Sequence, residues 1–268
     1  MRRLGIIGHL GMVTNFAGKS LTIAELEARK LHHDYSDLIT RAVQPALWLL
    51  VVGPVLAGIR AIPTGTLPYI DFMAPGILAQ SVLFISIFYG IATIWERDLG
   101  IIHKFLVTPT SRSALVLGKA ISAGERGLAQ AAIVFVLSLA LGVHLNWSLP
   151  ALLLVIVVII LGSALFSTFS LIIACLVKTR ERFMGMGQVL TNPLFFASNA
   201  IYPIAIMPGW LQVVSQINPL TYMVDALRTL MLVNGPTTYG VPFDLLFLLV
   251  AITINVTIAA KLYPRIVI

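Results

Sequence analysis

Cysteine and charged residues are both scarce in this chain. Cys175 is the single cysteine among 268 residues, so one chain can form neither an internal disulfide nor a thiolate metal site. Only 11% of the residues are charged, whereas a typical soluble domain carries about 25%. This low charge content excludes a water-soluble fold, and we expect Cys175 to be a small buried apolar residue.

Repeats, low-complexity tracts and nucleotide-binding motifs are also missing. Without a repeat or a composition shift, we expect a single membrane domain over residues 1–268. Gly18-Lys19-Ser20 is similar to the end of a phosphate-binding loop, but Val13 stands where such a loop needs its first glycine. We therefore predict that this chain binds no cofactor of its own.

Residues suited to catalysis or metal binding are not grouped. Residues 32–34 (His-His-Asp) have no second cluster to complete a four-ligand site, so we interpret them as a polar interfacial turn. The acids Asp71, Asp225 and Asp244 are far apart and have no accompanying histidine, which disfavours an intramembrane enzyme. We predict no catalytic residues and no metal site.

Long apolar runs dominate what is present. Hydrophobic residues make up 58% of the chain, and about 20 mostly apolar residues suffice for a helix to cross a bilayer. We therefore predict an all-α polytopic membrane protein with six transmembrane helices, at residues 42–59, 72–94, 114–143, 149–177, 183–207 and 243–262.

Positive charge is distributed unevenly between these runs. With the N-terminus in the cytoplasm, fifteen lysines and arginines fall in cytoplasmic segments and only Arg60 and Arg228 fall outside, while Arg126 lies within the third run. This bias predicts a multi-pass protein of the cell membrane with both termini cytoplasmic. Topology and contact with anionic membrane lipids account for the net charge of +7, so we do not expect nucleic-acid binding.

The N-terminal 41 residues are polar and contain one helix signal. Thr22–Glu25 forms a capping box, and the following residues place apolar side chains on one face. This pattern predicts an amphipathic helix in the membrane interface, with a solvated linker helix as the alternative. No cleavable signal peptide is expected, because the early apolar run is interrupted by His9, Thr14 and Asn15.

Local signals refine the spans and their links. Gln44-Pro45 and Gly53-Pro54 should bend the first span. Lys178–Arg182 is interpreted as a tight internal turn. The longest external segment, 208–242, contains a helical pattern at Tyr222–Val233.

Polar residues inside the fifth run exceed what a lipid-facing helix needs. They serve either helix packing or a face that lines a transport path, and the residues alone leave both open. Neighbouring aromatic residues line the same path or contact lipid. The candidate translocation-path residues are Trp48, Phe84, Tyr89, Gln188, Asn192, Phe195, Phe196, Asn199 and Tyr202.

Glu125 and Arg126 stand out in the third run. One interpretation places them near the inner interface, because the uninterrupted apolar run begins only at Gly127. The other makes them a functional pair in an inner vestibule, since charges at membrane depth are costly and usually paired.

The link from Trp95 to Ser113 is longer than the four to six residues or so that a simple turn needs. Its apolar-basic segment Ile101–Leu106 precedes a stop at Pro109. Exposed apolar residues on such a loop indicate docking of a partner protein, with a second interfacial helix as the alternative.

Four blocks together resemble the membrane subunits of ABC exporters of the second permease class, the daunorubicin-resistance and nodulation-factor exporter type. The blocks are residues 44–48 (QPALW), 96–119 (ERDLGIIHKFLVTPTSRSALVLGK), 192–211 (from Asn-Pro to Trp-Leu) and 218–228 (NPLTYMVDALR). They occur in the family's order and cover nearly the whole chain. One departure is Asn199, where the family pattern has a glycine.

This resemblance implies a fold and partners. It implies six helices, an amphipathic N-terminal helix, short re-entrant outer helices after the fifth span, and a dimer with itself or a related permease. Separate ABC ATPase subunits would bind ATP and Mg. They would dock on the loop through Glu96, Arg97, Lys104, Phe105, Leu106, Val107, Pro109 and Arg112.

The predicted function is thus the transmembrane subunit of an exporter for an amphipathic drug, lipid or glycolipid-like substrate. The alternative is an ion-coupled transporter or channel without an ATPase, which would want buried acids or a repeat. The sequence leaves the substrate open.

Overall fold

The computed structural model describes residues 35–60, 62–65, 67–99, 112–177 and 179–263. The predicted amphipathic N-terminal helix and loop residues 100–111 lie outside this part of the chain. The described helices and helical turns are α2 (Tyr35–Leu47), η1 (Trp48–Val52), α3 (Gly53–Ile59), α4 (Tyr69–Phe88), α5 (Gly90–Asp98), α7 (Arg112–Ala140), α8 (Leu149–Leu176), α9 (Arg180–Phe196), η2 (Ile204–Ile206), α10 (Gly209–Ile217), α11 (Pro219–Met231) and α12 (Val241–Leu262).

Helices long and apolar enough to cross a membrane confirm the all-α multi-pass prediction. Within the described ranges there are five of them, and they are Thr40–Ile59, Tyr69–Asp98, Leu115–Ala140, Leu149–Leu176 and Val241–Leu262. The predicted count of six is therefore not reached by this criterion, because the fifth predicted run does not form one long helix.

The run at 183–207 is divided at Phe196. Helix α9 has 17 residues and ends there, and the chain then turns through residues 197–202. Pro203 disfavours helix in the residue before it, and the Ser198 hydroxyl donates to the Phe195 carbonyl at 2.7 Å, which competes with the helical pattern. The start also differs from the prediction, because the Thr179 side chain accepts from the Arg182 N–H and begins the helix inside the predicted turn.

The first span contains the predicted irregularity. Pro54 has no N–H to donate to the Leu50 carbonyl, so the regular helical ladder cannot continue through it. The Gly53 N–H instead bonds the Trp48 carbonyl, five residues back, and Trp48–Val52 is a π-helical turn. Helices α2 and α3 therefore meet at a change of helical register.

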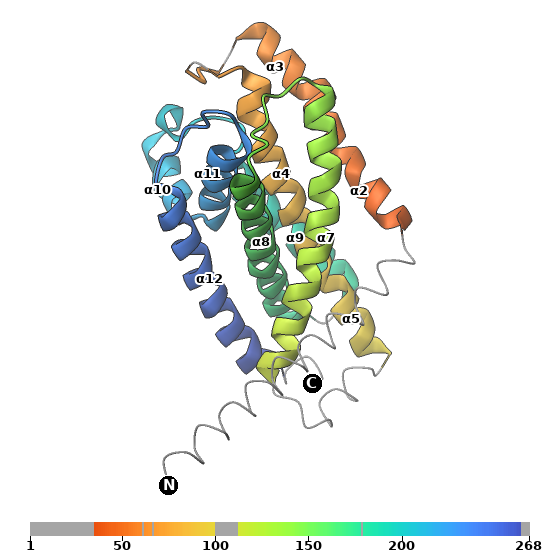
Figure 1. Ribbon diagram of the computed structural model, residues 1–268. Helices are drawn as coiled ribbons and strands as arrows, with labels where there is room; N and C mark the ends of the chain where they lie inside the picture. The colour runs from red at the N-terminus through yellow and green to blue at the C-terminus, as the bar shows by residue number, and fades with distance from the viewer. Residues whose placement is uncertain (1–34, 61, 66, 100–111, 178, 264–268) are drawn as a thin grey trace.

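Helices α4 and α8 occupy the middle of the bundle (Figure 1). Helix α8 packs against α7, α12, α4 and α11. Helix α11 is almost wholly buried between α4, α8 and α12, so the segment predicted to be external folds back onto the bundle. The helix predicted at Tyr222–Val233 begins earlier, because the Asn218 side chain caps the Leu220 N–H and Pro219 suits the first turn.

The bundle has two distinct ends in Figure 1. We call the end that carries α10 and α11 the α11 end, and the opposite end, where α5 terminates, the α5 end. At the α11 end the α7–α8 link pairs with the segment after α11, through an antiparallel bridge between Leu145 and Leu232. Gly76 of α4 meets the turn after α9 so closely that a Cβ there would collide with the Ala200 backbone.

Candidate functional site

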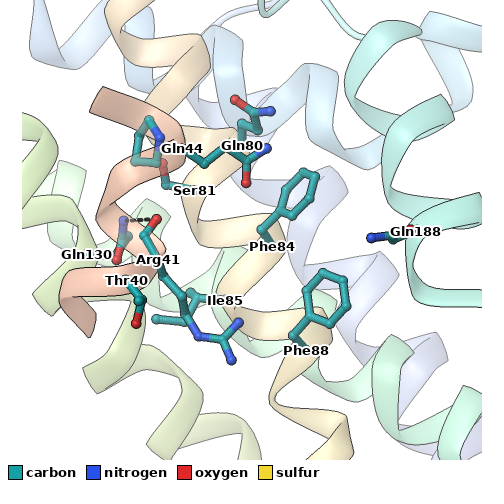
Figure 2. A pocket seen from close by; sticks show the side chains of 11 residues that line it. Thr40, Arg41, Gln44, Gln80, Ser81, Phe84, Ile85, Phe88, Gln130 and Gln188 are labelled. Carbon is teal, nitrogen blue, oxygen red and sulfur yellow. Dashed lines mark hydrogen bonds between the residues drawn. The ribbon is translucent and has the colours of Figure 1, made fainter. Parts of the chain in front are cut away.

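A pocket of about 330 Å³ opens among α2, α4, α7 and α9, and the first three of these belong to helices that are long enough to cross a membrane. Figure 2 shows its lining side chains, which come from all four helices. They are Thr40, Arg41, Gln44, Pro45, Gln80, Ser81, Phe84, Ile85, Phe88, Gln130 and Gln188.

Helix α4 forms one wall because of its residue spacing. Gln80, Phe84 and Phe88 recur every four residues, which places them on one helix face. The rings of Phe84 and Phe88 lie 6.1 Å apart between centroids. In Figure 2 both rings lie between Gln80 and Gln188 of the facing helix α9. This wall therefore presents one amide group and two aromatic rings to the pocket.

Four glutamines, one from each helix, give the pocket its polar character: Gln44, Gln80, Gln130 and Gln188. The Gln130 amide nitrogen donates to the Arg41 carbonyl at 3.5 Å, which ties α7 to α2. Gln80 and Gln130 are only 3% and 1% exposed. Their side-chain oxygens have no hydrogen-bond partner among the described residues. Unpartnered buried amides are costly, so this polarity is not explained by packing.

The structure brings two of the predicted path residues, Phe84 and Gln188, into this pocket. Trp48 and Phe195 lie instead in an edge-to-face contact with centroids 5.6 Å apart, outside the lining. Phe196 stacks at an angle on Phe195, 5.2 Å between centroids, and is half exposed.

The remaining path residues are dispersed. Asn192 is exposed on α9, and the Tyr202 hydroxyl donates to the Phe196 carbonyl. Asn199 is buried in the turn after α9, where its side-chain oxygen has no partner in the described part of the chain. Tyr89 lies between α4 and α5, beneath two cations.

Gln80 and Gln130 were missed as site residues in the sequence. A single uncharged amide does not interrupt an apolar run, whereas Gln188 lies among the grouped polar residues of the fifth run. A single glutamine in the middle of a membrane-length run is nevertheless a signal, because polar side chains at that depth face the bundle interior or a cavity.

A buried ion pair joins α5 to α7 near the α5 end. The Lys119 ammonium donates to the Glu96 carboxylate at 2.6 Å, and both residues are nearly inaccessible, at 7% and 6% exposure. Lys119 also donates to Thr93 at 3.4 Å. Glu96, predicted to contact a partner, thus directs its carboxylate into the bundle.

The predicted vestibule pair lies near this ion pair on the same helix. The Arg126 guanidinium packs over the Tyr89 ring at 4.7 Å, and Lys119 lies 5.9 Å from the same ring. Both Glu125 and Arg126 are partly buried. The structure therefore joins one predicted vestibule residue to one predicted path residue through a cation–π contact.

A second polar cluster ties α5 to the α8–α9 turn. Asp98 accepts from Arg97 at 3.1 Å and from Arg180 at 3.0 Å. Arg97 also donates to the Val177 carbonyl, and the Arg180 guanidinium lies 3.5 Å over the Trp95 ring. Three segments thus converge where the predicted docking loop leaves α5.

The predicted docking residues themselves are mostly outside the described part of the chain. These are Lys104, Phe105, Leu106, Val107 and Pro109. Arg112 is the first residue of α7.

Charges at the α11 end are held differently. Arg228 is 3% exposed and donates to the carbonyls of Phe72 and Asn199, at 3.3 and 2.7 Å. Asp225 accepts from the backbone N–H groups of Thr238 and Tyr239 at 2.9 and 3.0 Å. Two charged side chains of α11 thus bind backbone groups from other segments of the chain.

A polar pocket among helices that can cross a membrane suits a transport protein, and comparison with known proteins identifies the family. The model of the ABC-2 type transporter family matches residues 19–232. The chain belongs to this family. It is 31% identical over 198 residues to a putative transport permease ycf38 of Cyanophora paradoxa, covering 72% of this chain and 67% of that protein.

Two further relatives of this permease carry more specific names. The daunorubicin resistance ABC transporter permease protein DrrB1 of Streptomyces coeruleorubidus is 25% identical over 195 residues, 73% of this chain and 68% of that protein. Nodulation protein J of Rhizobium meliloti (strain 1021) is 26% identical over 199 residues, 74% of each. The resemblance found in the sequence is confirmed, and the family is one of transport permeases rather than enzymes.

Proposed function

We propose that this permease is the membrane subunit of an ATP-driven exporter of an amphipathic substrate, and that the glutamine-lined pocket is part of its translocation path. The observation that carries the proposal is the pocket itself, which places buried uncharged polar groups inside membrane-length helices. ATP and Mg would be bound by a separate ATPase subunit, and a second permease copy or a related permease would complete the path.

The arrangement supports a cytoplasmic α5 end. Cations of several helices gather there, whereas among the described residues the opposite end has Arg60 and Arg228. The gathered cations are Arg97, Lys119, Arg126, Arg180, Arg182 and Lys261. The positive-inside rule then makes this end cytoplasmic.

Helix α9 completes the proposed set of six crossings. It starts at the α5 end, where Arg180 meets Asp98, and near its other end the Leu194 carbonyl accepts from Asn218 at the start of α11. Its 17 residues extend about 25 Å, close to the thickness of the hydrocarbon core. Helices α10 and α11 would then be the re-entrant outer elements.

The proposed docking element is the segment 96–112. Its start is held by two contacts, since Glu96 pairs with Lys119 of α7, which follows the segment, and Asp98 pairs with Arg180 at the start of α9. Displacement of the segment by a docked ATPase would therefore move α5, α7 and α9 together. Helices α7 and α9 both line the pocket.

The test is a double substitution, Phe105→Glu with Leu106→Glu, in the permease co-expressed with its ATPase. Loss of ATPase co-purification and of ATP-driven transport is expected. The volume-preserving exchange Phe105→Leu with Leu106→Phe is the matched control and should keep both. Transport along an ion gradient by the purified permease alone would instead support the ion-coupled alternative and overturn the proposal.

A further inference from the structure

The glutamine-lined pocket contains hydrogen-bond acceptors without donors. The side-chain oxygens of Gln80 and Gln130 are both buried, and neither has a partner among the described residues. Leaving such a group unpaired costs on the order of 1–3 kcal/mol each. Evolved sites carry this cost where a bound molecule supplies the missing partner.

The orientation of Gln130 is set by its other atom. Its nitrogen donates to the Arg41 carbonyl, so the oxygen remains the free end of the amide. Figure 2 shows this bond as the dashed line beside Arg41. A ligand that binds to Gln130 must therefore supply a hydrogen-bond donor.

The pocket also offers flat apolar surface. The tilted rings of Phe84 and Phe88 lie along the wall between the two sides of the pocket. Aromatic rings bind the faces of other rings, including the C–H faces of sugars, through dispersion and hydrophobic contact. The complementary ligand therefore has a ring with donors at its edge.

The charges of the lining disfavour a cationic ligand. Its eleven residues include Arg41 and no acid. A cation would lose its hydration without meeting a carboxylate, at a cost that two amide oxygens do not offset.

From these features we propose that the pocket binds a ring-bearing amphiphile without positive charge, whose hydroxyl or N–H groups donate to Gln80 and Gln130 while its ring lies against Phe84 and Phe88. This inference rests on the proposed export function and names the substrate class for the same site. A glycolipid headgroup and a polyhydroxylated aromatic compound share this chemistry.

The experiment uses the full permease in lipid nanodiscs and three dansyl-labelled probes of equal chain length. The first is an alkyl glucoside, the second is its fully O-methylated form, and the third is an alkyl trimethylammonium. The methylated probe keeps the ring and its acceptors but has lost every donor. Binding is followed by dansyl emission against empty nanodiscs. We expect the glucoside to bind about tenfold more tightly than the methylated probe, the equivalent of one to two hydrogen bonds.

Gln80→Leu is the decisive variant, with Gln212→Leu as its matched control. Gln212 lies on α10 and donates to the Met207 carbonyl, away from the pocket. Gln80→Leu should reduce the preference for the glucoside at least fivefold, whereas Gln212→Leu should leave it unchanged. Because Gln80→Leu removes an unpaired buried oxygen, its melting temperature should stay equal or rise.

Three results would overturn the inference. They are equal binding of the glucoside and its methylated form, tightest binding of the ammonium probe, or a melting temperature that falls in Gln80→Leu together with binding, which would make the amide structural. None of these measurements needs the ATPase. Failure here while the Phe105–Leu106 test succeeds would therefore reject the substrate class and leave the export function standing.

Discussion

Helices α5 and α11, at the two ends of the bundle, hold their charges in different ways. At the α5 end, side chains pair with side chains, as Lys119 does with Glu96 and Arg180 does with Asp98. At the α11 end, the charged side chains of α11 itself bind backbone groups, as Arg228 does with the carbonyls of Phe72 and Asn199, while Asp71 of α4 pairs with the His144 side chain at 2.8 Å.

This difference separates a rigid end from one that can rearrange. A charge bound to backbone fixes the local path of the chain, because carbonyls and N–H groups cannot turn away independently. A pair of side chains can follow two helices as they shift, since each partner has several rotatable bonds. Helices at the α5 end can therefore shift while α11 at the other end stays fixed. This agrees with the proposal that coupling starts at the α5 end.

Breaking the Lys119–Glu96 ion pair at the α5 end should have the largest effect on stability. Lys119→Met leaves the Glu96 carboxylate buried without its cation, and we expect the free energy of unfolding to fall by roughly 3–5 kcal/mol. Thermal unfolding of the detergent-solubilised protein measures this. Adding Glu96→Gln to Lys119→Met should recover most of the loss, and no recovery would show that the pair is not the source.

Removing the buried cation at the α11 end should have an intermediate effect on stability. Arg228→Met leaves the Phe72 and Asn199 carbonyls without their donor, with an expected loss of about 2 kcal/mol. Arg228→Lys should lose less, because it keeps a charge but not the planar fork of donors. Arg60, which is exposed at the same end, provides the control: Arg60→Met should change stability by less than about 0.5 kcal/mol. Equal losses of unfolding free energy in Arg228→Met and Arg60→Met would contradict the distinction between a buried and an exposed cation.

The smallest effect on stability is expected at the half-exposed cluster. Asp98→Asn weakens its contacts with Arg97 and Arg180, and such exposed pairs contribute about 0.2–1 kcal/mol. Raising the salt concentration should narrow the difference between the variant and the parent protein. A loss as large as that of Lys119→Met would mean that the cluster is less accessible to solvent than the structure indicates.

Apolar runs without polar interruption were located well from the sequence. The fourth run was predicted at residues 149–177 and forms α8, Leu149–Leu176. Its flanks explain the success, because Pro150 favours a helix start and polar residues follow the end. The last run was found equally closely, at Val241–Leu262.

The fifth run shows what hydropathy cannot detect. Residues 197–202 lie within a run that is long enough to span a membrane, yet they form a turn because Ser198 bonds backward and Pro203 follows. Average hydropathy records only composition, whereas the turn depends on which hydrogen bonds each residue can make.

The pocket could be predicted only in part. Phe84 and Gln188 were identified because they lie in or beside polar or aromatic runs, but their meeting with Gln80 and Gln130 depends on how four helices pack. Packing of this kind is a tertiary property, and spacing along one helix fixes only which residues share a face.

The change of helical register at Trp48–Val52 has an energetic consequence for the pocket. Helix α2 forms one wall, and its hydrogen-bond ladder is already interrupted where it joins α3. Tilting α2 about this joint breaks no regular helical bond, whereas bending α4 or α7 beside the pocket would. We expect the pocket to change its volume mainly by movement of α2. The proline-bearing first span is therefore the most flexible wall of the pocket, and the walls formed by α4 and α7 are stiffer.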